Sequence, residues 1–135
     1  MNSISTEQLF DGLLRKNGLK SKSTIDTFYQ KKLVDSIHNL IENVKWNGIL
    51  SVEDVNKDNL FEIMLSLFEN GFSSGKVIVS FAFLIEVMKK DEKFYDMCII
   101  AIKHQIFPIV NANGGWVRFL LILTVFNSIF RTTLS

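Results

Sequence analysis

The stretch GKVIVSFAFLIEVM, residues Gly75 to Met88, decides the fold that the sequence predicts. Between Val77 and Met88 only Ser80 and Glu86 are polar, so a helix here would be apolar on nearly every side. Its many Val, Ile and Phe residues also suit a buried strand, and periodicity alone does not separate the two. The run is longer than an ordinary strand and continues into two lysines without a turn residue, which favours a helix. The sequence therefore predicts a central helix that other segments must surround.

Three helices are predicted before this stretch, from capping residues and from apolar residues that recur every three or four positions. The first begins at a capping box, Ser5 to Gln8, and stops at Asn17-Gly18. A second begins at a capping box of Ser23 and Asp26 and carries its apolar stripe as far as Val44. The third covers residues 60–68, and Asn70-Gly71 ends it. Nothing reads as an alternating strand with hairpin turns, so the fold class is all-α.

Two further helices are predicted after it. Ser73 or Ser74 caps the central helix, and Asp91-Glu92 caps the next, which extends to Phe107. Pro108, the only proline, is expected to break that helix. A turn at residues 111–115 then leads into a final helix from Trp116 to about Phe130, which is too short to span a bilayer and is expected to be core.

The composition predicts one compact domain, residues 1–135. With 47% hydrophobic and 21% charged side chains the chain can bury a substantial core. Its 15 basic and 14 acidic residues are interspersed, so no patch for nucleic acid is expected. One cysteine excludes an internal disulfide and fits a reducing cytoplasmic setting. The N-terminus has no long apolar core and does not resemble a secretory signal.

No catalytic or metal-binding set is visible, so an enzyme is not expected. The segment GFSSGK, residues 71–76, lacks the spacing, the Ser or Thr and the preceding strand of a phosphate-binding loop. His38 and His104 have no metal-ligand residues at suitable spacing, so no metal or other cofactor is predicted. Cys98 lies in an apolar run and is expected to be a buried structural thiol.

Two features at helix starts are candidates for a functional role. Lys76 falls in the predicted first turn of the central helix, where the helix dipole disfavours a cation by about 0.3–1 kcal/mol. Gly75 precedes it, and Gly114-Gly115 precede Trp116; glycines at such positions allow another backbone to approach closely. The plain alternatives, a solvated lysine and ordinary turn glycines, stay open on local grounds.

Two segments of the chain resemble a known family. The segment LFENGFSSGKVIVSFAF, residues 67–83, resembles the first homology motif of the B-cell lymphoma 2 (Bcl-2) apoptosis regulators. The segment PIVNANGGW, residues 108–116, is similar to their second motif, with Asn113, Gly114, Gly115 and Trp116 matching letter for letter. This resemblance implies a Bcl-2-like helical bundle around a central buried helical hairpin.

The resemblance also implies a hydrophobic groove for the amphipathic death helix (Bcl-2 homology 3, BH-3) of pro-apoptotic partners. Gly75 and Lys76 are similar to the family's Gly-Arg pair, in which glycine admits the ligand helix and arginine pairs with its aspartate. A lysine cannot form the bidentate fork that arginine forms. The other groove residues, the first three of them placed by the phase of their apolar stripe, are expected to be Leu33, Ile37, Leu40, Ile63, Leu67, Asn70, Val79 and Phe83.

The expected function is therefore that of an anti-apoptotic, virus-encoded Bcl-2 homologue acting in the host-cell cytoplasm, with recruitment to mitochondria by a partner. The expected partners are pro-apoptotic Bcl-2 family proteins, with no nucleic acid and no integral membrane span. One alternative is a Bcl-2 fold without a groove that blocks an innate-immune signalling adaptor through its surface. Another is self-association into a homodimer through exposed helix faces, which is compatible with ligand binding.

Overall fold

The protein is an all-α bundle in a computed structural model that describes residues 5–20, 28–43, 54–116, 118, 119, 121, 122 and 125. No strand occurs among these residues, which confirms the predicted fold class. The elements in chain order are α1 (Thr6–Lys16), α2 (Phe28–Asn43), α3 (Leu60–Leu67), α4 (Ser74–Lys90), the 3-10 turn η1 (Glu92–Phe94), α5 (Tyr95–Ala101), the π-helical turn η2 (Ile102–Ile106) and α6 (Phe107–Ala112).

Helix α4 is the centre of the bundle, as the Gly75–Met88 stretch predicts. Ten of its residues are buried, including Phe81 and Phe83 with no exposed surface. Ser80 is also buried, and its hydroxyl donates to the Val77 carbonyl at 2.7 Å within the same helix. This buried polar group is therefore satisfied within its own helix and needs no partner from a neighbouring helix.

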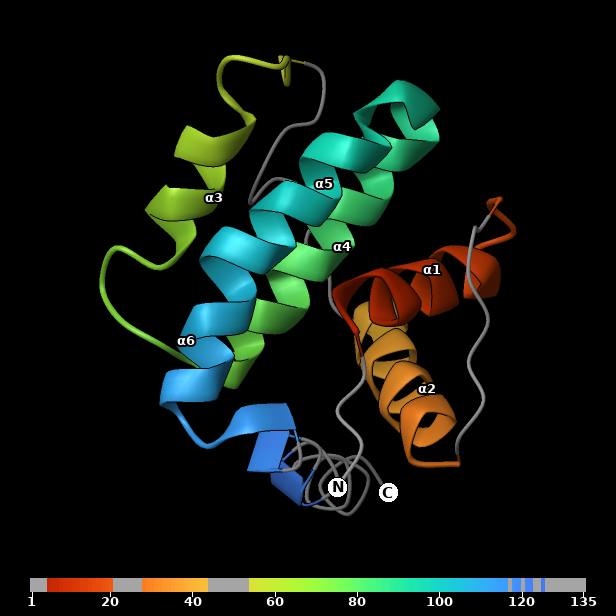
Figure 1. Ribbon diagram of the computed structural model, residues 1–135, viewed down its shortest axis with the longest axis vertical. Coiled ribbons are helices and arrows are strands. Elements are labelled where there is room, and N and C mark those ends of the chain that lie inside the picture. Colours follow the sequence, from red (N-terminus) through yellow and green to blue (C-terminus); the bar gives the residue numbers. More distant parts are fainter. Residues whose placement is uncertain are drawn as a thin grey trace.

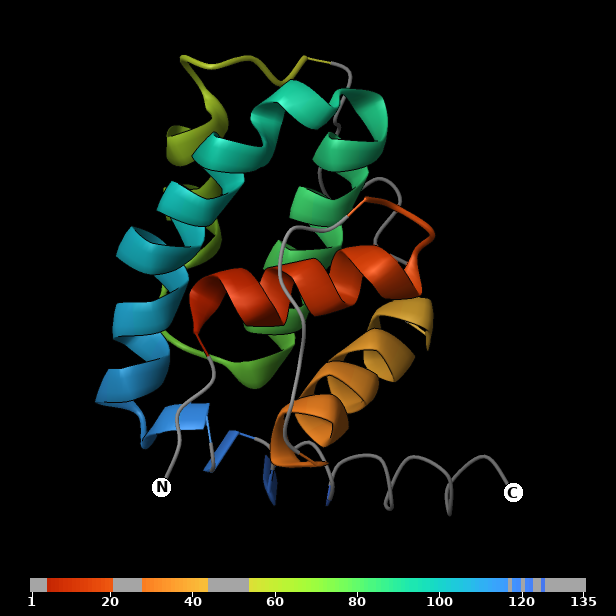
Figure 2. The ribbon, with the colours of Figure 1, turned by 45° about the vertical axis from the view of Figure 1, so that its right-hand side comes forward.

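The other helices cover α4 from different directions. After α4 the chain turns back at Asp91, and α5, η2 and α6 run alongside it (Figure 1). Helices α1 and α2 lie on one side of this pair, and α3 lies on the other, as both ribbon views show (Figures 1 and 2). Helix α2 packs against α1 and α4, and α3 packs against α4 and α5. Helix α4 therefore lies at the centre of the bundle, as the sequence predicts.

The predicted caps are present wherever the structure describes them. The Ser5 hydroxyl accepts a hydrogen bond from the Gln8 backbone N–H at 3.1 Å, and the Gln8 side chain accepts one from the Ser5 N–H at 3.3 Å. Ser73 caps α4, and the Asp91 carboxylate accepts from the Lys93 N–H at 3.0 Å. The predicted capping box of Ser23 and Asp26, the end of the second helix near Val44 and the far end of the last helix lie outside the described residues.

Pro108 does not break the chain's helix, and this prediction was wrong. The Phe107 N–H instead bonds to the Ile102 carbonyl, five residues back, and α6 continues to Ala112. Pro108 has no N–H to donate to the His104 carbonyl, and in a regular α-helix its ring would collide with that carbonyl. The wider π turn in front of the proline removes this conflict while the helix goes on.

Polar contacts join helix α1 to α5 and to η2. The Tyr95 hydroxyl donates to the fully buried Asp11 carboxylate at 2.8 Å, and burial together with this bond raises the pKa of the Tyr95 phenol. Near the surface the Lys103 ammonium lies 2.7 Å from the Glu7 carboxylate, and the bond lowers the pKa of Glu7. A buried carboxylate requires such donors, so these contacts fix where α1 sits.

Candidate functional site

The candidate site is the start of α4 and the loop that leads into it from α3. Ser73 has extended backbone angles, and its hydroxyl accepts a hydrogen bond from the Lys76 backbone N–H at 3.1 Å. Gly71 in the loop has a φ of 105°, a conformation that side-chain-bearing residues rarely adopt. The loop therefore makes a sharp, glycine-dependent turn, and α4 begins directly beyond it.

Lys76 lies in the first turn of α4, where the sequence placed it. Its ammonium group turns back and donates to the Gly71 carbonyl at 3.0 Å. This bond gives the cation a local acceptor that offsets its unfavourable position near the positive end of the helix dipole. A lysine ammonium has three N–H donors, so the bond to Gly71 leaves others for a second acceptor.

Gly75 is exposed, and the space around it is open. A Cβ built at this position meets one neighbouring atom within 4 Å, the Ser73 hydroxyl oxygen at 3.9 Å, which is ordinary contact distance. The backbone of Gly75 is helical and its φ is not in the left-handed region. Within the described residues neither backbone conformation nor packing therefore requires glycine at this position.

Four of the other predicted groove residues are half-buried or exposed. Val79 is half-buried one turn further along α4, and Asn70 is exposed in the loop. Ile63 and Leu67 are half-buried one turn apart on α3, which packs against α4. They come from α3, the loop after it and α4, consecutive parts of the chain that also carry Gly75 and Lys76.

The remaining four predicted groove residues are inside the bundle. Leu33, Ile37 and Phe83 have no exposed surface, and Leu40 has 6% of its surface exposed. The three α2 residues belong to the same core as Phe83, because α2 packs against α4. Their role as groove walls stays a prediction; in this structure they contribute to the core.

The second motif forms the junction between α6 and the helical residues that follow. The Asn113 side chain donates to the Ile109 carbonyl at 2.7 Å and so closes the end of α6. Gly114 and Gly115 both have positive φ angles, 108° and 79°. A Cβ on Gly114 would come within 2.3 Å of Arg118, so glycine is required there by conformation and by packing.

Trp116 follows these glycines and is buried, with 5% of its surface exposed. Its ring packs on Phe81 of α4 at 6.2 Å between centroids, and also on Phe107 and Phe119. The two segments that carry the resemblance therefore meet in space through Trp116 and Phe81. The indole Nε1 is buried without a hydrogen-bond partner among the described residues.

The Cys98 thiol is not poised to act as a nucleophile. Cys98 is fully buried, and burial raises the pKa of its thiol to about 12, so the nucleophilic thiolate is strongly disfavoured. Within the described ranges, no group of three or more His, Cys, Asp or Glu is placed to hold a metal ion. Among the helices described, none combines the length and the apolar character needed to cross a membrane.

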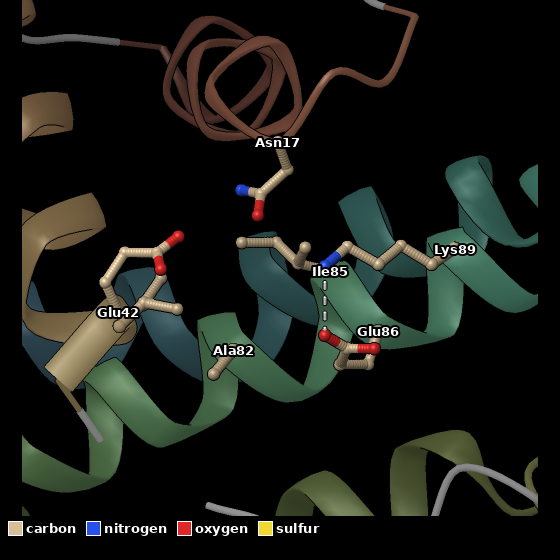
Figure 3. Close-up of a pocket in the computed structure, with 7 residues that line it drawn as sticks. Asn17, Glu42, Ala82, Ile85, Glu86 and Lys89 are labelled. Atoms are coloured by element: carbon tan, nitrogen blue, oxygen red, sulfur yellow. Dashed lines mark hydrogen bonds and ion pairs between the residues drawn. The ribbon is translucent and has the colours of Figure 1, made fainter. Parts of the chain in front are cut away.

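One pocket was not foreseen from the sequence. It lies between α1, α2 and the second half of α4, and its lining residues are Asn17, Ile41, Glu42, Ala82, Ile85, Glu86 and Lys89 (Figure 3). Helix periodicity gave no signal for it, because the lining comes from three helices whose relative placement is a tertiary property. In the sequence, Asn17 indicates only the end of the first helix and not a place in a pocket.

No protein-family model matches the sequence, and no curated protein matches it.

Proposed function

We propose that this chain is a Bcl-2-like inhibitor of apoptosis that binds the BH-3 helix of pro-apoptotic Bcl-2 family proteins beside the first turn of α4. The observation that carries the proposal is the open glycine at position 75, where a Cβ meets no atom closer than 3.9 Å. The packing of the free protein does not explain why position 75 is a glycine. A ligand backbone that approaches closely at this position would explain it.

Lys76 supplies the charge that such a ligand would meet. Its ammonium is anchored to the Gly71 carbonyl and retains donor capacity for the carboxylate of a ligand aspartate. An exposed lysine-carboxylate pair contributes only about 0–1 kcal/mol. We therefore expect Lys76 to set the register of the ligand helix and the choice of partner more than the affinity.

Apolar contacts supply the affinity in this proposal. Ile63 and Leu67 on α3 and Val79 on α4 are half-buried, and in this proposal they offer a partly apolar surface to the ligand helix. Burying four apolar anchors of that helix gives about 1.5–3 kcal/mol each, while ordering a disordered ligand costs about 2–5 kcal/mol in total. The apolar anchors therefore outweigh the cost of ordering the ligand, and the remainder offsets part of the cost of association.

The buried residues Leu33, Ile37, Leu40 and Phe83 enter the proposal through a conformational change. They can reach a ligand only when α2 moves away from α4, because almost none of their surface is exposed. We expect the ligand-bound state to have α2 displaced outward, with the binding energy offsetting the separation of the two helices.

Titration calorimetry with a panel of BH-3 peptides tests the proposal, using the variant Gly75→Leu. Since the free protein has room at this position and leucine is a good helix former, the variant should fold and melt like the parent. It should lose detectable binding, because its side chain occupies the space that the ligand backbone needs. Glu92→Leu, at an exposed position in η1, is the matched control and should bind normally. Binding by Gly75→Leu with the parent's affinity would remove the groove hypothesis.

We also propose where in the cell this activity takes place. We place the protein in the host-cell cytoplasm as a virus-encoded survival factor that reaches mitochondria through its pro-apoptotic partner. Expression of the parent, but not of Gly75→Leu, should protect cells from a death stimulus that acts through BH-3 proteins.

The burial of Leu33, Ile37, Leu40 and Phe83 favours a second candidate function. A Bcl-2-like bundle whose groove residues stay inside would act through its surface, by blocking an innate-immune signalling adaptor. This alternative expects no heat change with any BH-3 peptide and recovery of an adaptor in pull-downs. Sedimentation tests self-association through helix faces, which can accompany either function.

A further inference from the structure

A second candidate site lies on the opposite half of α4 from Gly75. The pocket between α1, α2 and α4 begins at Ala82 and extends to Lys89. Glu86 follows Gly75 by eleven positions, which corresponds to about 16 Å along a helix. The pocket therefore lies apart from Gly75 and Lys76, at the contact between α2 and α4.

The lining combines a small apolar floor with a polar rim, and polar atoms make up most of its accessible surface. Ile41, Ala82 and Ile85 supply the apolar part and are almost completely buried. At the rim the Asn17 amide points from α1 toward the pocket, and the Glu42 carboxylate reaches in from α2 (Figure 3). The Asn17 side-chain nitrogen donates to the Leu13 carbonyl at 2.8 Å, which holds the amide in place, and its oxygen is an acceptor for a cationic ligand.

The charges at the rim favour a cation. The Lys89 ammonium lies back along α4 and bonds to the Glu86 carboxylate at 3.1 Å, so these two charges balance (Figure 3). Glu42 has no lysine or arginine partner among the residues described. Its contact with the His38 imidazole, at 3.7 Å, is ionic only when the histidine is protonated. With His38 neutral the lining therefore carries one negative charge that is not balanced from within.

The volume limits what can enter. The pocket holds about 170 Å³, whereas sites for drug-sized ligands have about 300–1,000 Å³. A nucleotide or an amphipathic helix does not fit in such a space. An aliphatic stem of a few carbons with one charged end does, because the stem can lie on the apolar floor while its end reaches the rim.

We propose that this pocket binds a single aliphatic cation, with its carbon chain against Ile41, Ala82 and Ile85 and its charged group between Glu42 and the Asn17 amide oxygen. The charged group is an ammonium or a guanidinium, carried either by a lysine or arginine of a partner protein or by a small free amine. Both sources present the same chemistry to the pocket.

Nuclear magnetic resonance titration of the full chain with butylguanidinium and butylammonium tests the proposal. Saturable shifts are expected at the Asn17 side-chain amide and at the backbone amides of Ala82 and Glu86. Butyrate, an anion of similar size, should give none. Added salt should weaken the binding, because the Glu42 side chain is 62% exposed and its charge is screened.

Three variants test whether negative charge at the pocket strengthens the binding of the cation. Glu42→Gln should raise the Kd about two- to fivefold, the range expected for one exposed ion pair. Lys89→Met should lower it by a similar factor, because it releases the Glu86 carboxylate toward the pocket. Glu69→Gln removes the same charge from an exposed position beyond α3 and should change nothing. No saturable shift, equal binding of butyrate, or an unchanged Kd in Glu42→Gln would each overturn the cation site.

A last comparison separates the two sources of the cation. N-acetyl-arginine amide carries the same guanidinium as butylguanidinium together with the backbone of a polypeptide. Tighter binding of the arginine amide identifies the side chain of a partner protein as the natural ligand, and equal binding identifies a small amine. Either result retains the cation site.

Discussion

The Trp116 indole packs on the Phe81 ring of α4, with 6.2 Å between ring centroids and an angle of 42° between the ring planes. Residue 81 lies within the segment 67–83 and Trp116 ends the segment 108–116, so this contact joins the two parts of the chain that resemble Bcl-2 motifs. A buried aromatic cluster with Phe107 and Phe119 surrounds it. The junction beyond α6 thus stabilises the helix that carries Gly75 and Lys76.

We expect Trp116→Ala to lower the free energy of unfolding by about 3–5 kcal/mol, because it leaves a cavity beside Phe81. Trp116→Phe should cost much less. It keeps an aromatic ring and removes a buried N–H that has no partner among the described residues. Denaturant unfolding measures both, and Leu121→Ala, at a site 62% exposed, is the control. Equal losses for the Ala and Phe variants would contradict this account.

The buried Asp11 carboxylate depends on the Tyr95 hydroxyl, 2.8 Å away. Tyr95→Phe should lower the free energy of unfolding by about 1–3 kcal/mol, since it leaves a buried acceptor without this donor. The pKa of the Tyr95 phenol is raised above its usual 10 by burial and by Asp11. The stabilising contribution of the neutral phenol is therefore present below pH 10 and is lost as the pH rises above that value. Chemical denaturation at pH 7 and above pH 10 checks both statements. The parent should lose free energy of unfolding above pH 10 as the phenol ionises, and Tyr95→Phe should not show this contribution.

The Glu7 carboxylate has a lowered pKa because Lys103 donates to it at 2.7 Å. A carboxylate whose pKa is lower in the folded state contributes stability above its unfolded pKa, and loses it as the pH falls through the folded pKa. Lys103→Gln should return the pKa of Glu7 toward its usual value of 4.5. Carbon-detected titration of the Glu7 carboxyl group measures this. Lys93→Gln, at another exposed lysine, should leave it unchanged.

Lys76→Asp should separate the role of this residue in folding from its role in binding. An acidic residue in the first turn of α4 is favoured by the helix dipole by about 0.3–1 kcal/mol, which offsets the lost bond to Gly71. The variant should therefore melt close to the parent. Its affinity for acidic BH-3 peptides should fall more in low salt than in high salt, because the added repulsion is screened. A loss that does not depend on salt would speak against a charge role for Lys76.

The local features of this protein were determined by its sequence alone. The apolar run around Phe81 and Phe83 required a helix that is wrapped on all sides, and the structure places α4 accordingly. Ser5, Ser73 and Asp91 cap helices as predicted. Such features depend on residues within one or two turns of each other, so the printed sequence contains everything that determines them.

Other features were decided only by the tertiary structure. An apolar stripe on α2 identifies a face but not what covers it, so sequence alone could not tell that Leu33 and Ile37 are fully buried in the core. Pro108 signalled a break, yet a π turn carries the helix past it, because the chain can widen locally when packing favours continuation. The pocket lined by Glu42 and Lys89 exists because three helices meet there. Contacts between residues far apart in sequence depend on how helices are placed, and helical periodicity does not contain that information.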